Sequence, residues 1–362
     1  MTVRRIATLL SLVALPVLAQ GAARSPGVEG DHVIPNFRFA SGETIPELRL
    51  HYRTLGQPRR DANGVVRNAV LIMHGTTGSG TQFLSPSFAG ELFGVGRPLD
   101  TTRHYIILRD GIGHGLSSRP SEGLHARFPH YNYDDMVEAD HRLLTEKLGV
   151  THLRLVMGTS MGGMQSWVWA ERYPDFMDGV VPLASVPTAI VGRNRMIRRM
   201  AMDDIRTDPE WKNGEYSAAP RGLRAALQLL YMMSSAPLVQ HRDAPTRDSA
   251  DAVINRFLDG RMKNTDANDF LYAFDSSRDY DPEPLLARIK APLLAINSAD
   301  DQVNPPELGI IERLITQVKH GRFHMIPISV ETRGHGTHTV AKVWKASFEQ
   351  FLRSLPPLPP LH

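Results

Sequence analysis

The feature that most constrains the fold of this 362-residue chain is a serine held between glycines directly after a short apolar run. Residues 153–157 (LRLVM) have the composition of a buried strand, and residues 164–173 (MQSWVWAERY) are typical of a helix. Glycines at 158, 162 and 163 surround Ser160 and allow a sharp turn that lifts its side chain above a sheet. The segment indicates either a nucleophile elbow or an ordinary glycine-rich turn, and the two differ in whether Ser160 has partners elsewhere.

Short apolar runs of the same kind recur along the chain and alternate with helical patterns. Residues 37–56 predict an antiparallel strand pair that turns at 41–42, and residues 133–148 predict a helix with acidic residues in its first turn. The other apolar runs suit buried parallel strands: residues 69–73, 104–108, 153–157, 179–184, 293–297 and 323–328. Strands that alternate with helices predict an α/β fold, with a mostly parallel central sheet flanked by helices on both faces.

One long segment interrupts this alternation. Residues 188–286 contain no clear strand but several helical patterns, and we interpret them as a helical cap inserted into the core. The core then consists of two parts, residues 31–187 and 287–354, and the proline-rich residues 355–362 are expected to form a flexible tail.

The N-terminus has the order of a secretory signal peptide. Arg4 and Arg5 precede the apolar residues 6–19, and small residues follow up to Ala23. The apolar run is shorter than the roughly 20 residues that cross a bilayer. We expect residues 1–23 to direct export to the periplasm or the medium and to be removed after Ala19 or Ala23, without stable membrane insertion. The alternative is a retained membrane anchor.

Composition excludes several classes of function. The net charge of +3 and the lack of long runs of like charge argue against nucleic-acid binding. The chain has no cysteine, which removes disulfides, zinc–thiolate sites and cysteine nucleophiles. No phosphate-binding loop or HExxH-type histidine spacing is present, so we expect no cofactor and no metal. These features favour a protein that acts on a small molecule.

The partners that a nucleophilic serine needs occur later in the required order, each just past a strand. Asp300 and Asp301 follow residues 293–297, and His335 follows residues 323–328 on a loop between glycines. We favour Asp301 because such an acid lies a few residues before the prolines of the next helix, and His335 because His338 is expected near the final helix. An isolated aspartate is usually a turn residue and an isolated histidine is usually solvated or packed. Three such residues in order predict a Ser160, Asp301 and His335 triad.

Donors for an oxyanion are expected from two backbone positions. The sequence HGTTG follows residues 69–73, and the N–H of Thr76 in this loop would act together with the N–H of Met161 after the nucleophile. The alternative is a glycine-rich turn with no such role. His74 is expected to be a structural hydrogen-bonding residue and not a base.

Taken together, these segments resemble the α/β-hydrolase superfamily and, within it, the homoserine O-acetyltransferase-like group. The resemblance covers residues 37–352 and includes HYRTLG, GRPLDTTRHYII, SMGGMQSWVWAERYPD, DPEWKNGEY and DANDFLYAFDSSRDYD. It implies the α/β-hydrolase fold with a cap, a homodimer, and a nucleophile, acid and base at Ser160, Asp301 and His335.

Some positions depart from that group. Its acetyltransferases read Gly-His-Asp at the histidine, with the acid close to the substrate amine, whereas Gly336 follows His335 here. The oxyanion loop is closer to that of ordinary hydrolases, and residues 231–234 (YMMS) stand where the group has Tyr-Arg-Ser. A cation for a substrate carboxylate could come instead from residues that are otherwise a solvated helix face: Arg193, Arg195, Arg198 and Arg199.

Export bears on the acyl acceptor, because acetyl-CoA is a cytoplasmic metabolite. The sequence therefore predicts an exported serine hydrolase that cleaves a carboxylic ester or related small acyl compound through an acyl-enzyme. The alternative is a homoserine O-acetyltransferase with acetyl-CoA as its co-substrate. A non-catalytic binding protein with the same fold is disfavoured by the intact triad.

Overall fold

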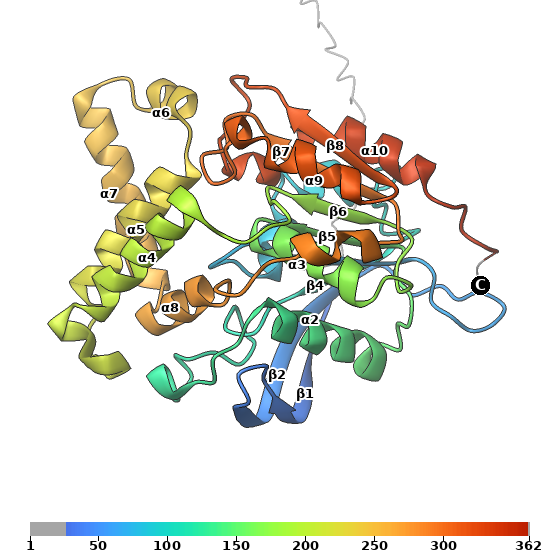
Figure 1. Ribbon diagram of the computed structural model, residues 1–362, viewed down its shortest axis with the longest axis horizontal. Coiled ribbons are helices and arrows are strands. Elements are labelled where there is room, and N and C mark those ends of the chain that lie inside the picture. The colour runs from blue at the N-terminus through green and yellow to red at the C-terminus, as the bar shows by residue number, and fades with distance from the viewer. Residues whose placement is uncertain (1–26, 361–362) are drawn as a thin grey trace, which may run out of the picture.

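The computed structural model describes residues 27–360, in which eight strands form one sheet in the order β1-β2-β4-β3-β5-β6-β7-β8 (Figure 1). Strands β3 to β8 are parallel, while β1 and β2 form an antiparallel pair whose second strand also runs antiparallel to β4. The predicted α/β-hydrolase fold, with its mostly parallel sheet, is therefore confirmed. The strand bounds are β1 Val28–Arg38, β2 Thr44–Leu55, β3 Ala69–Met73, β4 Tyr105–Arg109, β5 Leu155–Thr159, β6 Val180–Leu183, β7 Leu293–Ser298 and β8 Gly321–Ile326.

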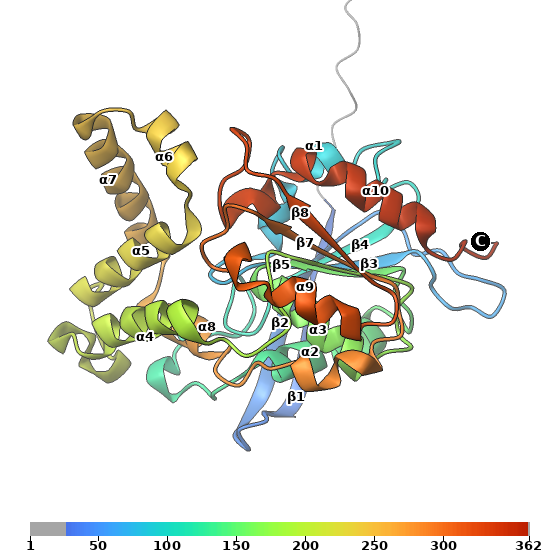
Figure 2. The ribbon, with the colours of Figure 1, turned by 45° about the horizontal axis from the view of Figure 1, so that its top comes forward.

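Alternating residues of the inner strands pack on opposite faces of the sheet, which explains why most residues of these strands are apolar. Leu71 and Val156 face α2 (Tyr133–Arg142), α3 (Met161–Arg172) and α9 (Ile310–Leu314). Ile72 and Leu155 face α1 (Ala89–Leu92) and α10 (Lys345–Ser354). The two sets of helices cover the two faces in Figure 2. The predicted helix at 133–148 is α-helical to Arg142 and ends in a π-helical turn, Leu143–Lys147.

The segment between β6 and β7 is a group of helices that projects from one end of the core (Figure 1). They pack around a small apolar core of their own that includes Met202, Leu227 and Phe270. The turn Glu283–Arg288 lies outside this group, because Leu286 packs in the core beneath α3. The helices of the cap are α4 Gly192–Arg206, α5 Arg221–Ser234, α6 Pro237–Asp243, α7 Arg247–Asn264 and α8 Ala267–Asp275.

The two ends of the chain differ in what the structure describes. The expected signal peptide, residues 1–23, lies outside the described residues. At the start of the segment predicted as a tail, residues 355–362, Leu355 is buried in the core and the Pro356 carbonyl accepts a hydrogen bond from Arg154 at 2.7 Å. Within residues 27–360, no helix has both the length and the apolarity needed to span a membrane.

Candidate active site

Ser160 lies on a strained turn between β5 and α3. Its φ of 55° and ψ of −113° place a non-glycine residue in a sparsely populated backbone region. The glycines around it allow close backbone contact: a Cβ on Gly162 would clash with the Met73 carbonyl oxygen, and one on Gly163 would clash with that of Leu183. The segment therefore has the geometry of a nucleophile elbow, with the serine at the N-terminus of a helix.

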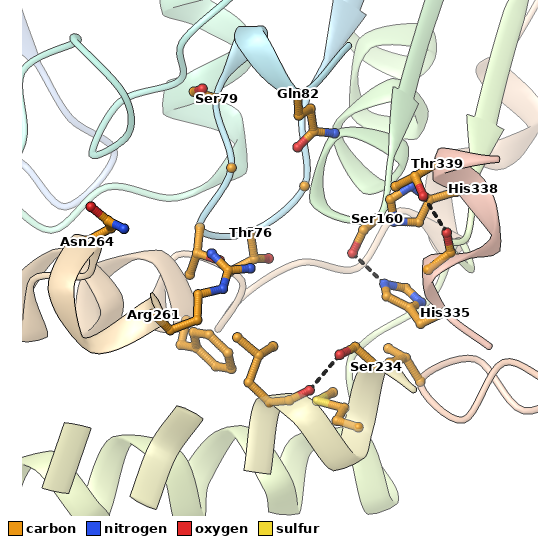
Figure 3. A pocket seen from close by; sticks show the side chains of 18 of the residues that line it. Thr76, Ser79, Gln82, Ser160, Ser234, Arg261, Asn264, His335, His338 and Thr339 are labelled. Atoms are coloured by element: carbon orange, nitrogen blue, oxygen red, sulfur yellow. Dashed lines mark hydrogen bonds between the residues drawn. The ribbon is translucent and has the colours of Figure 1, made fainter. Parts of the chain in front are cut away.

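The structure brings the three residues of the predicted triad into direct contact. His335 Nε2 lies 2.7 Å from Ser160 Oγ, a contact drawn as a dashed line in Figure 3. On the other side of the ring, Nδ1 lies 2.9 Å from Oδ2 and 3.1 Å from Oδ1 of Asp301. If Nδ1–H donates to the carboxylate, Nε2 is left to accept the proton of the serine hydroxyl. This tautomer makes His335 a base that is directed at Ser160.

Asp301 is fully buried, and its carboxylate is surrounded by donors. It accepts hydrogen bonds from the backbone N–H of Val303 at 2.8 Å and from the Asn304 side chain at 3.0 Å, in addition to His335. Burial alone would raise the pKa of Asp301, but the neighbouring His335 and these donors together hold it below its ordinary value. The carboxylate is therefore ionised at neutral pH and can orient the imidazole.

The neighbouring Asp300 contacts the loop that carries His335 and not the imidazole of His335 itself. It accepts hydrogen bonds from Ser298 Oγ at 2.5 Å and from the N–H of Gly334 at 3.0 Å, so it ties the loop after β7 to the loop that carries His335. The structure thus places Asp301, and not Asp300, against the imidazole.

His338 lies in a short 3-10 turn, Gly336–Thr339, rather than near the start of α10 as expected. Its ring centroid is 5.5 Å from that of His335, and its Nδ1 is buried without a hydrogen-bond partner among residues 27–360. Burial, with a smaller contribution from His335, lowers the pKa of His338 to about 3, so the ring is neutral. This proximity of a second histidine was not foreseen, because sequence spacing alone does not place the turn.

The loop expected to supply an oxyanion donor lies directly beside Ser160. A Cβ on Gly75 would lie 3.4 Å from that of Ser160, and Thr76 lines the cavity in front of the serine (Figure 3). Met161 is the first residue of α3, where a backbone N–H has no acceptor within the helix. Both predicted donors therefore flank the serine, as an oxyanion hole requires.

His74 holds this loop in place. Its Nδ1 lies 2.9 Å from the Gly75 carbonyl oxygen, and its Nε2 accepts the N–H of Gly111 at 3.0 Å. Burial, and then the charge of Arg109, keep the pKa of His74 well below its ordinary value, so the ring is a neutral hydrogen-bonding group. This agrees with the structural role expected from the sequence.

The serine opens into a cavity of about 580 Å³ between the core loops and the cap. Its charged lining residues other than histidine are Arg119, Arg198 and Arg261; no aspartate or glutamate lines it within the described part of the chain. The remaining cap residues on its wall are Leu230, Met233, Ser234, Phe257, Asn264 and Phe274. Of these residues, the sequence offers Arg198 as a candidate cation for a substrate carboxylate and Met233 as one of a cluster of cap methionines that either pack in a core or line a pocket.

Of the four arginines that were expected either to bind a substrate carboxylate or to form a solvated helix face, only one lines the cavity. Arg198 is buried and lines the cavity, whereas Arg199 is exposed and pairs with Asp203 at 2.5 Å. Arg193 is exposed and contacts the Gln302 carbonyl oxygen at 3.2 Å, and neither it nor Arg195 lines the cavity.

Among residues 27–360, no group of three or more acidic, histidine or cysteine side chains could hold a metal ion.

Comparison with known proteins identifies the class to which this fold and site belong. The family model described as the alpha/beta hydrolase fold matches residues 68–323, and the chain belongs to that family.

Within the family, the chain belongs to the homoserine O-acetyltransferase-like group. It is 30% identical over 335 residues to the homoserine O-acetyltransferase of Pelobacter propionicus, covering 81% of this chain and 87% of that protein. It is also 30% identical over 279 residues to a protein of Methanothermobacter thermautotrophicus named "Probable acyltransferase", covering 77% and 84%. The solved structure of the acetyl esterase MekB superposes with a TM-score of 0.75 at 25% identity, covering 91% and 97%. The protein is therefore an enzyme of the hydrolase or O-acyltransferase type.

Proposed function

We propose that this enzyme is an exported hydrolase of small carboxylic esters that works through an acyl-enzyme on Ser160. The observation that carries the proposal is the continuous contact from Asp301 through His335 to Ser160, which opens into the cavity. His335 Nε2 takes the hydroxyl proton as Ser160 Oγ attacks the ester carbonyl, and Asp301 stabilises the imidazolium that forms. The N–H groups of Met161 and Thr76 hold the oxyanion of the tetrahedral intermediate.

The intermediate then collapses and the enzyme is regenerated. The bond to the leaving alkoxide breaks, and His335 returns its proton to that oxygen, which leaves the acyl group on Ser160. A water molecule attacks the acyl carbon, gives one proton to His335, and releases the carboxylic acid as the serine recovers its proton. No cofactor or metal is required by this scheme.

Two observations favour water over homoserine as the acyl acceptor. The ammonium group of an amino-acid acceptor calls for a carboxylate, and among the described residues no aspartate or glutamate lines the cavity. Gly336 stands where the acetyltransferases of the group have an acid after the histidine. Export out of the cytoplasm, which we expect residues 1–23 to direct, would also separate the enzyme from acetyl-CoA.

Homoserine O-acetyltransferase activity is the second candidate, because relatives with that name match most of the chain at 30% identity. In that case acetyl-CoA is the acyl donor and the same triad serves both half-reactions. The resemblance also leads us to propose a homodimer, which size-exclusion chromatography with light scattering would test.

The test is an assay of the purified mature chain with 4-nitrophenyl acetate and, separately, with acetyl-CoA in the presence and absence of homoserine, with products read by mass. We expect ester hydrolysis that Ser160→Ala abolishes, while Ser354→Ala, an exposed serine at the end of α10, retains it. Turnover of the ester by Ser160→Ala would overturn the mechanism. Homoserine-dependent consumption of acetyl-CoA would replace hydrolysis by the second candidate.

A further inference from the structure

The cavity in front of Ser160 carries positive charge that the protein does not neutralise. Of its arginines, Arg119 has carboxylate neighbours, Glu122 at 3.7 Å and Asp269 at 3.9 Å. Arg198 and Arg261 have no aspartate or glutamate within ion-pairing distance in residues 27–360. The cap therefore contributes two guanidinium groups without counter-charge to the wall of the cavity.

Arg198, on α4, is the more deeply placed of the two. Arg198 is only 4% exposed, and its hydrogen-bond partners among the described residues are neutral side chains. Nε donates to the Asn194 side chain at 2.9 Å, Nη1 donates to Ser277 Oγ at 3.2 Å, and the guanidinium carbon lies 5.3 Å from the centre of the Phe274 ring. A buried cation without an anion is costly, and arginine does not escape that cost by losing its proton. Such a group is stabilised when a ligand supplies the missing charge.

Arg261, on α7, presents a second guanidinium to the same cavity. It is half-buried, and its guanidinium carbon lies 5.8 Å from the centre of the Phe257 ring. Figure 3 shows its side chain extending from the cap toward the side of the cavity formed by the Thr76 loop. In both arginines an aromatic ring lies against the guanidinium, an arrangement that supports a cation and leaves N–H groups at the edge of the plane available to a ligand.

We propose that Arg198 and Arg261 bind a carboxylate group of the substrate, and that the enzyme therefore prefers esters that carry a negative charge. The inference rests on the proposed ester hydrolysis at Ser160 and adds a substrate class to it. Guanidinium groups match the planar, two-oxygen geometry of a carboxylate, and the lining offers no acidic residue that would repel one. The charge lies on either the acyl or the alcohol part of the ester, away from the carbonyl that Ser160 attacks.

Matched substrate pairs test the proposal and locate the charge. The pair 4-acetoxybenzoate and methyl 4-acetoxybenzoate differs in charge on the alcohol part, and the pair 4-nitrophenyl hydrogen adipate and 4-nitrophenyl methyl adipate differs on the acyl part. We expect the anionic member of one pair to have the higher kcat/KM. Arg198→Met and Arg261→Met should each lower that value about ten- to a hundredfold, as expected for a lost charged hydrogen bond, mostly through KM.

Controls separate binding from folding. Arg199→Met on α4 and Arg256→Met on α7 remove exposed arginines that do not line the cavity, and we expect neither to change the preference. Arg198→Lys keeps a charge at the buried position and should retain part of the preference. Circular dichroism checks the fold of each variant, and hydrolysis of the neutral esters by Arg199→Met and Arg256→Met should stay unchanged.

The outcomes distinguish this proposal from the proposed function. Equal rates on both members of both pairs, with neutral esters still hydrolysed in a Ser160-dependent manner, would overturn the carboxylate site and leave the hydrolase intact. If no ester is hydrolysed, calorimetry gives an independent readout. It measures the binding of 4-acetoxybenzoate and of 4-nitrophenyl hydrogen adipate to the Ser160→Ala variant. Binding of either anion that is lost in Arg198→Met and Arg261→Met supports the site, and absence of binding of both overturns it.

Discussion

The α/β core and the helical cap line the same cavity with polar groups of two kinds. On the core side, Ser160 and His335 line the cavity and contact each other, and Asp301 lies behind the imidazole and is hydrogen-bonded to it. On the cap side, Arg198 and Arg261 face the cavity without a counter-ion in the described residues. The difference indicates that the chemistry is preorganised in the core, while the cap leaves binding capacity open for the substrate.

The largest expected effect concerns the hydrogen bond that fixes the tautomer of His335. Asp301→Asn keeps the shape of the side chain but presents an amide to Nδ1, so kcat for 4-nitrophenyl acetate should fall about 10⁴-fold. Asp300→Asn is the matched control, because Asp300 contacts Gly334 and not the imidazole, and its loss should be far smaller. Equal losses of kcat in the two variants would contradict the assignment of Asp301 as the acid of the triad.

A pair of glycines contrasts the tight packing of the core with the open surface of the cap. In Gly162→Ala the new Cβ meets the Met73 carbonyl oxygen, so we expect destabilisation of about 1 to 3 kcal/mol and loss of esterase activity. In Gly260→Ala, within α7, a Cβ meets nothing within 4 Å, and better helix propensity should stabilise the protein by about 1 kcal/mol. Urea denaturation measures the free energy of unfolding of both variants. A Gly260→Ala variant that is less stable than the unmodified protein would contradict the expected difference between core and cap.

A buried acid in the core predicts a pH dependence of stability. Burial, and then the charge of Asp134, raise the pKa of Glu171 from 4.5 to about 8. Between these values the unfolded chain binds fewer protons than the folded one, so stability falls as pH rises from about 4.5 to about 8. Glu171→Gln should flatten that part of the profile in melting experiments, and Glu47→Gln on the exposed side of β2 should not. An unchanged slope in Glu171→Gln would remove the buried acid as its cause.

The smallest expected effect is on the apolar wall that the cap supplies. Met233 is 4% exposed and lines the cavity, whereas Met232 beside it is 62% exposed. Met233→Ala should raise KM for longer acyl esters about tenfold, with kcat for acetate esters unchanged. Met232→Ala serves as the control, and a similar change in KM for both would argue against a cap-lined acyl site.

The sequence was sufficient to predict the contacts of the core because they follow from topology. Ser160 directly follows β5, Asp301 lies in the loop after β7 and His335 in the loop after β8, and carboxyl ends of parallel strands meet at one edge of a sheet. The apolar runs and the glycines that allow the Ser160 turn are local signals.

The cap residues could not be assigned in the same way, because their direction depends on how the helices pack together. Arg261 and Met233 have no sequence signal that places them on the cavity wall. A signal did exist for Arg198, which lies three, four and seven residues before Ala201, Met202 and Ile205, the buried face of α4. That spacing distinguishes it from Arg199, which lies on the exposed face.

The most direct measurement is the site of acylation during turnover. The enzyme is mixed with an acetyl ester, quenched in acid within the steady state, digested, and mapped by peptide mass spectrometry beside Ser160→Ala treated in the same way. The account predicts one acetyl group on the peptide that contains Ser160 and none at that position in the variant. Steady turnover with no acyl group on Ser160, or with the group on another residue that persists in Ser160→Ala, would contradict it.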